Sequence, residues 1–246
     1  MSERNIKLIL EYDGTNYAGW QYQKNAITIQ QTVEEAVESL TGAHSSVLAA
    51  GRTDRGVHAI GQVVSFKTKS KIPIERWPAA MNAVLPPDIR VKSSQNMPIA
   101  FHARFDAKGK RYKYFIWNAS YASALLRNRT LHISTLLNVS AMQEASRYLI
   151  GKHDFSSFQA SGSAVRDAVR EVWSTDVGRS GDIVSFSISG DGFLYNMVRI
   201  MVGTLIDVGI GKITADDMQA ILDAHDRRKA GKTVAPQGLY LMEVYY

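Results

Sequence analysis

The first half of the chain combines strand-like and helix-like patterns of apolar residues. Residues 6–12 alternate apolar and polar side chains, which is typical of a strand with one buried face. Residues 29–40 carry apolar side chains at helical spacing, with Thr28 as the N-cap and Gly42 as the end. Further apolar segments predict strands over 47–50, 62–68 and 89–92 and a helix over 74–84. The predicted order is β-α-β-β-α-β.

The second half repeats this order. The patterns predict strands over 112–117, 169–177, 183–189 and 239–245 and helices over 141–150, 193–208 and 215–224. We therefore expect an α+β fold of two tandem ferredoxin-like split βαβ halves, residues 1–105 and 106–246. Their antiparallel sheets are expected to face each other or join around a central basic cleft.

Composition narrows the class of protein. The 246 residues include no cysteine, which excludes disulfides and thiolate metal sites. Lys and Arg number 29 against 23 Asp and Glu, so the net charge of +6 fits a polyanionic partner. The six histidines show no HExxH spacing, and no glycine-rich phosphate motif is complete, so we predict no metal and no nucleotide cofactor.

The apolar segments also bear on location. The longest one, residues 193–210, contains Asn196, Arg199 and Asp207, which are costly inside a bilayer. The N-terminus has too short an apolar run for a signal peptide. We expect no membrane association and a cytoplasmic protein.

One carboxylate stands between two arginines in a loop bracketed by glycines, GRTDRGVHA at residues 51–59. Asp54 is a candidate nucleophile or general base, and we expect Arg52 and Arg55 to lower its pKa. The alternative interpretation is a hairpin loop with solvated charges.

A second candidate is Arg199, a cation within an apolar helical segment. A buried arginine needs a carboxylate or equivalent hydrogen bonds. Asp54 is the attractive partner if both halves line one cleft. The alternative is that Arg199 extends from the helix edge into water.

A third candidate is the strand RYKYF at residues 111–115, where Tyr112 and Tyr114 face one way and the basic residues face the other. Such a strand can stack bases and neutralise phosphates. Aromatic residues on a strand also commonly belong to the core. We expect one tyrosine in the core and the other in the site.

Six segments together resemble the TruA-type tRNA pseudouridine synthases. In chain order they are EYDGTNYAGWQ (11–21), AGRTDRGVHAIGQVVSF (50–66), FHARFDAKGKRYKY (101–114), HDFSSF (153–158), FLYNMVRIMVGTL (193–205) and APQGLYL (235–241). The resemblance implies that Asp54 is the catalytic nucleophile and that Arg199 pairs with it. It also implies that Tyr112 is the active-site tyrosine, expected to stack on the target base, with a part in removing the C5 proton as the alternative. Substrate contacts are expected from Tyr112, Arg52, Arg55, His58 and Leu239, with Arg52 displacing the base.

The resemblance also implies an isomerase that acts on uridines at tRNA positions 38 to 40, in the anticodon arm, without metal or cofactor. It implies a homodimer. A competing hypothesis is a non-catalytic RNA-binding or RNA-chaperone module that uses the same basic aromatic cleft. A third, a small-molecule glycosidase, normally requires a second carboxylate, and no convincing candidate lies beside Asp54.

Overall fold

The computed structural model describes residues 2–162 and 167–246 and has a mixed α+β fold with mostly antiparallel strand pairs. The chain divides into two compact units. The first contains Met1–Lys108 and Tyr240–Tyr246, and the second contains Gly109–Leu239. No helix among the described residues is long and apolar enough to cross a membrane.

The first unit is built on the antiparallel strand order β4-β1-β3-β2. Strand β1 (Arg4–Tyr12) lies between β3 (His58–Thr68) and β4 (Ile89–Met97), and the short β2 (Leu48–Ala49) pairs with β3. The alternation predicted for β1 is confirmed, because its buried apolar residues point to one face. This register brings the end of β1 beside the start of β3, where the GRTDRGVHA segment enters the sheet.

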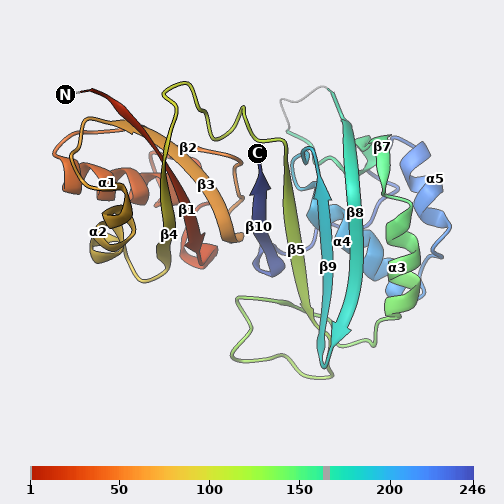
Figure 1. Ribbon diagram of the computed structural model, residues 1–246. Helices are drawn as coiled ribbons and strands as arrows, with labels where there is room; N and C mark the ends of the chain where they lie inside the picture. Colours follow the sequence, from red (N-terminus) through yellow and green to blue (C-terminus); the bar gives the residue numbers. More distant parts are fainter. Residues whose placement is uncertain (1, 163–166) are drawn as a thin grey trace. The chain divides into compact units, whose positions relative to one another are not determined.

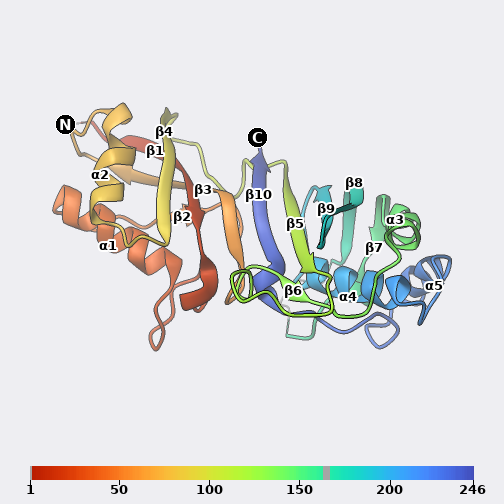
Figure 2. The ribbon, with the colours of Figure 1, turned by 90° about the horizontal axis from the view of Figure 1, so that it is seen from below.

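Two helices, α1 (Ile29–Thr41) and α2 (Trp77–Val84), lie on the same side of these strands (Figure 2). The predicted ends of α1 are confirmed: the Thr28 hydroxyl accepts a hydrogen bond from the Gln31 N–H, and Gly42 ends the helix at a φ of 70°. The predicted helix over 74–84 begins instead as a short 3-10 turn, Ile74–Arg76, before α2.

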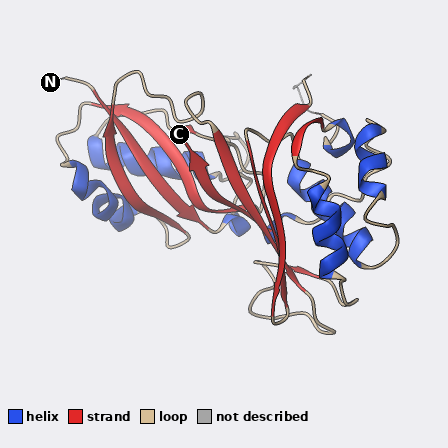
Figure 3. Cartoon of the chain, turned by 45° about the vertical axis from the view of Figure 1, so that its right-hand side comes forward, coloured by secondary structure: helices blue, strands red, loops and turns tan. Residues whose placement is uncertain are grey.

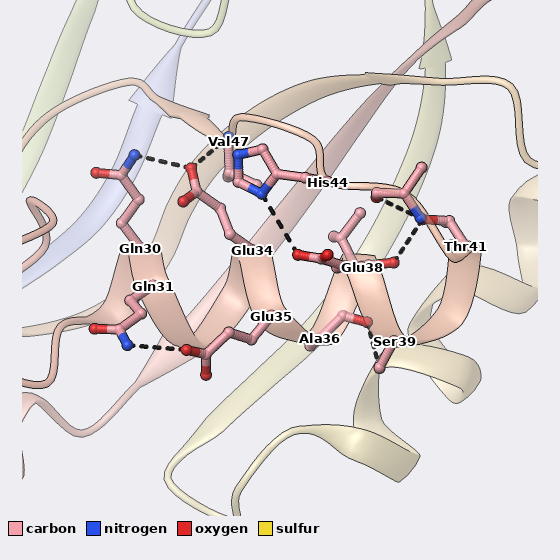
Figure 4. A network of polar contacts seen from close by, with 12 residues as sticks. Gln30, Gln31, Glu34, Glu35, Ala36, Glu38, Ser39, Thr41, His44 and Val47 are labelled. Atoms are coloured by element: carbon pink, nitrogen blue, oxygen red, sulfur yellow. Dashed lines mark hydrogen bonds and ion pairs between the residues drawn. The ribbon is translucent and has the colours of Figure 1, made fainter.

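Polar side chains on α1 hold the segment that leads into β2. Glu34 accepts hydrogen bonds from the Gln30 side chain and from the Val47 backbone N–H, each at 2.9 Å. Figure 4 draws both bonds. Glu38 lies 3.6 Å from the His44 ring, an exposed pair. The bond from Val47 to Glu34 joins α1 to the segment that leads through β2 into the Asp54 loop, so the start of that segment is held in place.

The second unit has the antiparallel strand order β5-β9-β8-β7. These strands are β5 (Gly109–Trp117), β9 (Ile183–Gly190), β8 (Val169–Ser180) and β7 (Gly151–Asp154). A two-residue strand, β6 (Leu131–His132), pairs in parallel with the end of β5. The short β6 and β7 were not predicted, because neither is long enough to show alternation.

The helices of the second unit are α3 (Val139–Arg147), α4 (Met197–Gly209) and α5 (Asp217–Asp223). They lie together beside the strands of their unit (Figure 3). Most of α4 is buried, as its apolar sequence predicts. It begins at Met197, four residues later than the pattern suggests, because Asn196 has a left-handed backbone conformation.

The last strand, β10 (Leu239–Tyr245), was predicted at the correct residues but has a notable partner. Tyr240 and Leu241 pair in parallel with His58 and Ala59 of β3, so Tyr240–Tyr246 belongs to the first unit (Figure 1). The domain division near residue 105 stays a prediction.

Candidate active site

The Asp54 loop, residues 51–57, connects β2 to β3 in the first unit. Its ends are tied down: the Ala50 N–H donates to the Val63 carbonyl at 2.8 Å, and the Val57 N–H donates to the Asp54 carbonyl at 3.0 Å. Asp54 itself is half-buried, whereas Arg52 and Arg55 are exposed. The loop therefore orders a carboxylate while leaving both neighbouring cations accessible to a ligand.

A buried network of polar side chains supports this loop. The Thr53 hydroxyl lies 2.7 Å from the Tyr12 hydroxyl, and the Gln62 side-chain N–H groups donate to the Tyr12 oxygen at 3.3 Å and to the Gly51 carbonyl at 2.7 Å. Thr53 is only 5% exposed and Gln62 is fully buried. Tyr12, Thr53 and Gln62, here called the support triad, thus fix the backbone on the N-terminal side of Asp54.

Burial raises the pKa of Tyr12 to about 12, against the smaller opposing effects of its hydrogen bonds with Thr53 and Gln62. The phenol is consequently neutral near pH 7 and serves as a structural hydrogen-bonding group. The support triad cannot be recognised from the sequence alone. Its members lie in two of the quoted segments, EYDGTNYAGWQ and AGRTDRGVHAIGQVVSF, but only the β1–β3 register brings them together.

The segment after β1 packs directly against the Asp54 loop. The Trp20 N–H donates to the Thr53 carbonyl at 2.9 Å. A Cβ on Gly19, which has a φ of 95°, would lie 2.8 Å from the same carbonyl, and a Cβ on Gly14 would collide with the Val57 carbonyl. Glycine is therefore required at both positions, because backbone meets backbone there.

His58 contacts protein groups at the C-terminal end of the loop. Its Nδ1 accepts a hydrogen bond from the Gly14 N–H at 3.1 Å and lies 3.1 Å from the Asp13 carboxylate. Its ring stacks on Tyr240, with centroids 4.6 Å apart, and the side chain is buried. These contacts join three segments of the first unit. A substrate contact by His58 stays a prediction.

Tyr112 and Tyr114 lie on β5 of the second unit, and both are buried. Tyr114 has no exposed surface, its hydroxyl donates to the Ala235 carbonyl at 2.6 Å, and burial raises its pKa. Tyr112 keeps 8% exposure and meets the Phe193 ring edge-on at 5.2 Å. Tyr114 is the core member of the pair, and a role for Tyr112 at the substrate stays a prediction.

Arg199 lies in the first turn of α4 and is half-buried. Its Nε donates to the Val234 carbonyl at 2.8 Å, and its Nη1 donates to the Asn196 side-chain oxygen at 2.7 Å. The guanidinium is thus held in place by groups of its own unit. The Asp54–Arg199 pair would join the two units and stays a prediction.

Two further expectations concern ligands: a substrate contact by Leu239 and the absence of a metal site. Leu239, expected to contact the substrate, is 6% exposed at the end of the second unit, and its role stays a prediction. Within residues 2–162 and 167–246, no three His, Asp or Glu side chains gather as they would around a metal ion.

The chain matches a known protein family over most of its length. A family model described as tRNA pseudouridine synthase matches residues 8–106 and 145–246, which include the support triad, the Asp54 loop and α4. The chain belongs to the tRNA pseudouridine synthase family. The match leaves out residues 107–144, and with them Tyr112.

Individual relatives in this family align over nearly the whole chain. A protein named tRNA pseudouridine synthase A from Acetivibrio thermocellus is 54% identical over 243 residues, covering 99% of this chain and 100% of the relative. Proteins of the same name from Thermoanaerobacter sp. and Ruminiclostridium cellulolyticum are each 50% identical, with the same two coverages. The resemblance to this family noted in the sequence is therefore confirmed.

Proposed function

We propose that this tRNA pseudouridine synthase isomerises uridine to pseudouridine in tRNA with the Asp54 carboxylate as its nucleophile. The observation that carries the proposal is the construction of the Asp54 loop. Three buried polar side chains, Tyr12, Thr53 and Gln62, fix the backbone beside one half-buried acid. A hairpin loop with merely solvated charges has no need of such support.

The chemistry explains why one carboxylate suffices. Isomerisation breaks the N1–C1′ bond of uridine and forms a C5–C1′ bond, while C5 loses a proton and N1 gains one. Atoms and electrons balance without a redox partner or a transferred external group, so no cofactor is required. Attack at C1′, attack at C6 and formation of a glycal all require an ionised acid next to the sugar or base. Asp54 supplies that charge.

The other predicted residues receive supporting roles. Arg199, oriented by Asn196 and Val234, would keep Asp54 ionised and oriented. Tyr112 would stack on the uracil, as aromatic side chains do with unstacked bases. Exposed Arg52 is suited to displace the target base, which must leave its stack to reach a half-buried acid.

The remaining expectations complete the proposal. The substrate uridines are those at tRNA positions 38 to 40 in the anticodon arm, and the enzyme acts as a homodimer. Two tandem ferredoxin-like halves are supported by the order β4-β1-β3-β2 in the first unit and by the order β5-β9-β8 in the second.

The test measures tritium released from C5-labelled uridine in unmodified tRNA. Asp54→Asn keeps the size of the side chain and removes its charge, so turnover should fall by at least about 1000-fold with tRNA binding retained. Asp176→Asn, which changes an exposed aspartate on β8, is the matched control and should release tritium normally. Turnover by Asp54→Asn at the control rate would overturn the proposal.

A further inference from the structure

A turn in the first unit presents an aromatic side chain that the proposed mechanism does not use. Phe105 is 74% exposed, although it is a large apolar residue. Single exposed apolar residues are common and carry no meaning alone. The surroundings of this ring, however, are ordered and specific.

The turn is anchored to the sheet through Ala103, which is fully buried. The Ala103 N–H donates to the Ser65 hydroxyl at 3.1 Å, and its carbonyl accepts from the Tyr246 hydroxyl at 2.7 Å. Phe101 packs on the Tyr246 ring, with centroids 5.3 Å apart. The base of the turn is therefore fixed to β3 and to the C-terminal residue, so Phe105 projects from a defined position.

The turn is also closed by its own hydrogen bonds. The His102 N–H donates to the Asp106 carboxylate at 2.9 Å, and the Asp106 N–H donates back to the His102 carbonyl at 3.1 Å. The His102 Nδ1 accepts the N–H groups of Arg104 at 3.1 Å and Phe105 at 3.4 Å. The imidazole thus orders the backbone that carries the exposed ring.

The same residues surround Phe105 with groups suited to a nucleotide. The His102 ring lies 4.3 Å from the Phe105 ring, centroid to centroid, and the Arg104 guanidinium carbon lies 5.7 Å from the Phe105 centroid. Arg104 is exposed, as is Lys108 nearby in sequence. An aromatic face beside cations provides both parts of single-stranded nucleic-acid binding, base stacking and phosphate neutralisation.

We propose that His102, Arg104 and Phe105, here called the 102–105 platform, bind an unstacked base of the RNA substrate, with Phe105 stacking on the base and Arg104 neutralising an adjacent phosphate. This proposal rests on the proposed function, which supplies the RNA. A second protein chain fits the platform less well, because the platform offers only one large exposed apolar side chain, Phe105, beside the exposed cation Arg104. In this proposal the platform contributes to the affinity for RNA and to its position on the enzyme, whereas Asp54 carries out the reaction.

The experiment uses the full-length protein and an unmodified tRNA transcript. Phe105→Ala should weaken tRNA binding about 5- to 100-fold and raise KM similarly, with kcat at saturating tRNA unchanged, because a base loses its stacking partner. Phe105→Trp should restore binding, since every base can stack on an indole. Leu125→Ala, which removes another exposed apolar side chain, is the matched control and should bind as wild type does.

A second readout is the salt dependence of binding. Arg104→Ala should lower the slope of log affinity against log salt by about 0.7, the value for one phosphate contact on a single strand. Wild-type affinity in Phe105→Ala would overturn the proposal, and so would a change in sedimentation with unchanged tRNA affinity, because the ring would then contact protein. Tritium release by the wild type is measured in parallel, so failure of the proposed function is recognised separately.

Discussion

The two reactive groups proposed here, Asp54 and Arg199, are held by their units in different ways. The Asp54 backbone is fixed indirectly, through the hydroxyl of the preceding Thr53 and the buried Tyr12 and Gln62. The Arg199 guanidinium is itself hydrogen-bonded, to Val234 and to Asn196. Substitutions in the buried support triad should therefore lower the rate without touching the substrate. At α4, by contrast, substitution of Arg199 itself should have the main effect.

Among the residues proposed to hold or support Asp54, the largest effect is expected from Arg199→Leu. The substitution removes the proposed partner of Asp54 and leaves two acceptors unpaired, so activity should fall at least about 100-fold and stability by about 1–3 kcal/mol. Tritium release and thermal unfolding measure the two losses. Arg179→Leu is the control, because Arg179 also bonds an asparagine oxygen, that of Asn118, at 2.7 Å and a carbonyl, that of Leu137, at 3.2 Å.

Arg179→Leu should therefore reduce stability and leave the rate intact. Equal rates for the two arginine variants would show that Arg199 has only a structural role.

An intermediate effect is expected from Thr53→Val. The valine keeps the volume but leaves the buried Tyr12 hydroxyl without one partner, so the loop should shift and kcat should fall about 10-fold with KM unchanged. Thr53→Ser should restore kcat. The control is Thr68→Val, which alters a buried threonine at the end of β3, away from the loop, whose hydroxyl accepts the Ser70 N–H at 3.1 Å.

The Thr68 variant should lose stability without losing kcat. If Thr53→Val and Thr68→Val had the same kcat, the support triad would not position Asp54.

The smallest effect is expected from Tyr12→Phe, because deleting the hydroxyl oxygen creates no clash and Gln62 still donates to the Gly51 carbonyl. In Thr53→Val a methyl group replaces a hydroxyl that lies 2.7 Å from the Tyr12 oxygen, so the loop itself has to move. We expect a loss of about 1 kcal/mol in the free energy of unfolding and a rate within about threefold of wild type. The folded-state pKa of Tyr12 is raised from 10.0 to about 12, so the stability that it adds is present below pH 10 and is lost as pH rises toward 12.

Denaturant titrations of wild type and Tyr12→Phe between pH 8 and 12 measure this difference directly. The advantage of wild type over Tyr12→Phe should shrink above pH 10. An advantage of wild type that increases above pH 10 would contradict the assignment of a buried, neutral phenol.

Local signals in the sequence were sufficient for some elements. The Thr28 and Gly42 caps of α1 depend on neighbouring residues, so both helix ends could be predicted. The pairing of Tyr240 with His58 could not, because it joins residues far apart in the chain and no short pattern specifies it. Element identity is local information, whereas strand partners depend on the whole fold.

The same distinction applies to the site. Asp54 could be named as a candidate from its arginine and glycine neighbours, with a loop of solvated charges as the alternative. Tyr12 and Gln62 could not, because their meeting beneath Thr53 depends on the register of β1 against β3, with an irregularity after Leu10. Charge patterns thus indicate a candidate carboxylate, and only the tertiary structure reveals which residues support its loop.

The central claim, that the Asp54 carboxylate carries the isomerisation, is tested most directly by single-turnover tritium release with enzyme in excess over C5-labelled tRNA. This regime removes product release from the observed rate. If the carboxylate is the nucleophile, wild type releases tritium rapidly and Asp54→Asn releases none above the protein-free level, although both bind tRNA. Release by Asp54→Asn at the wild-type rate would contradict this role of Asp54.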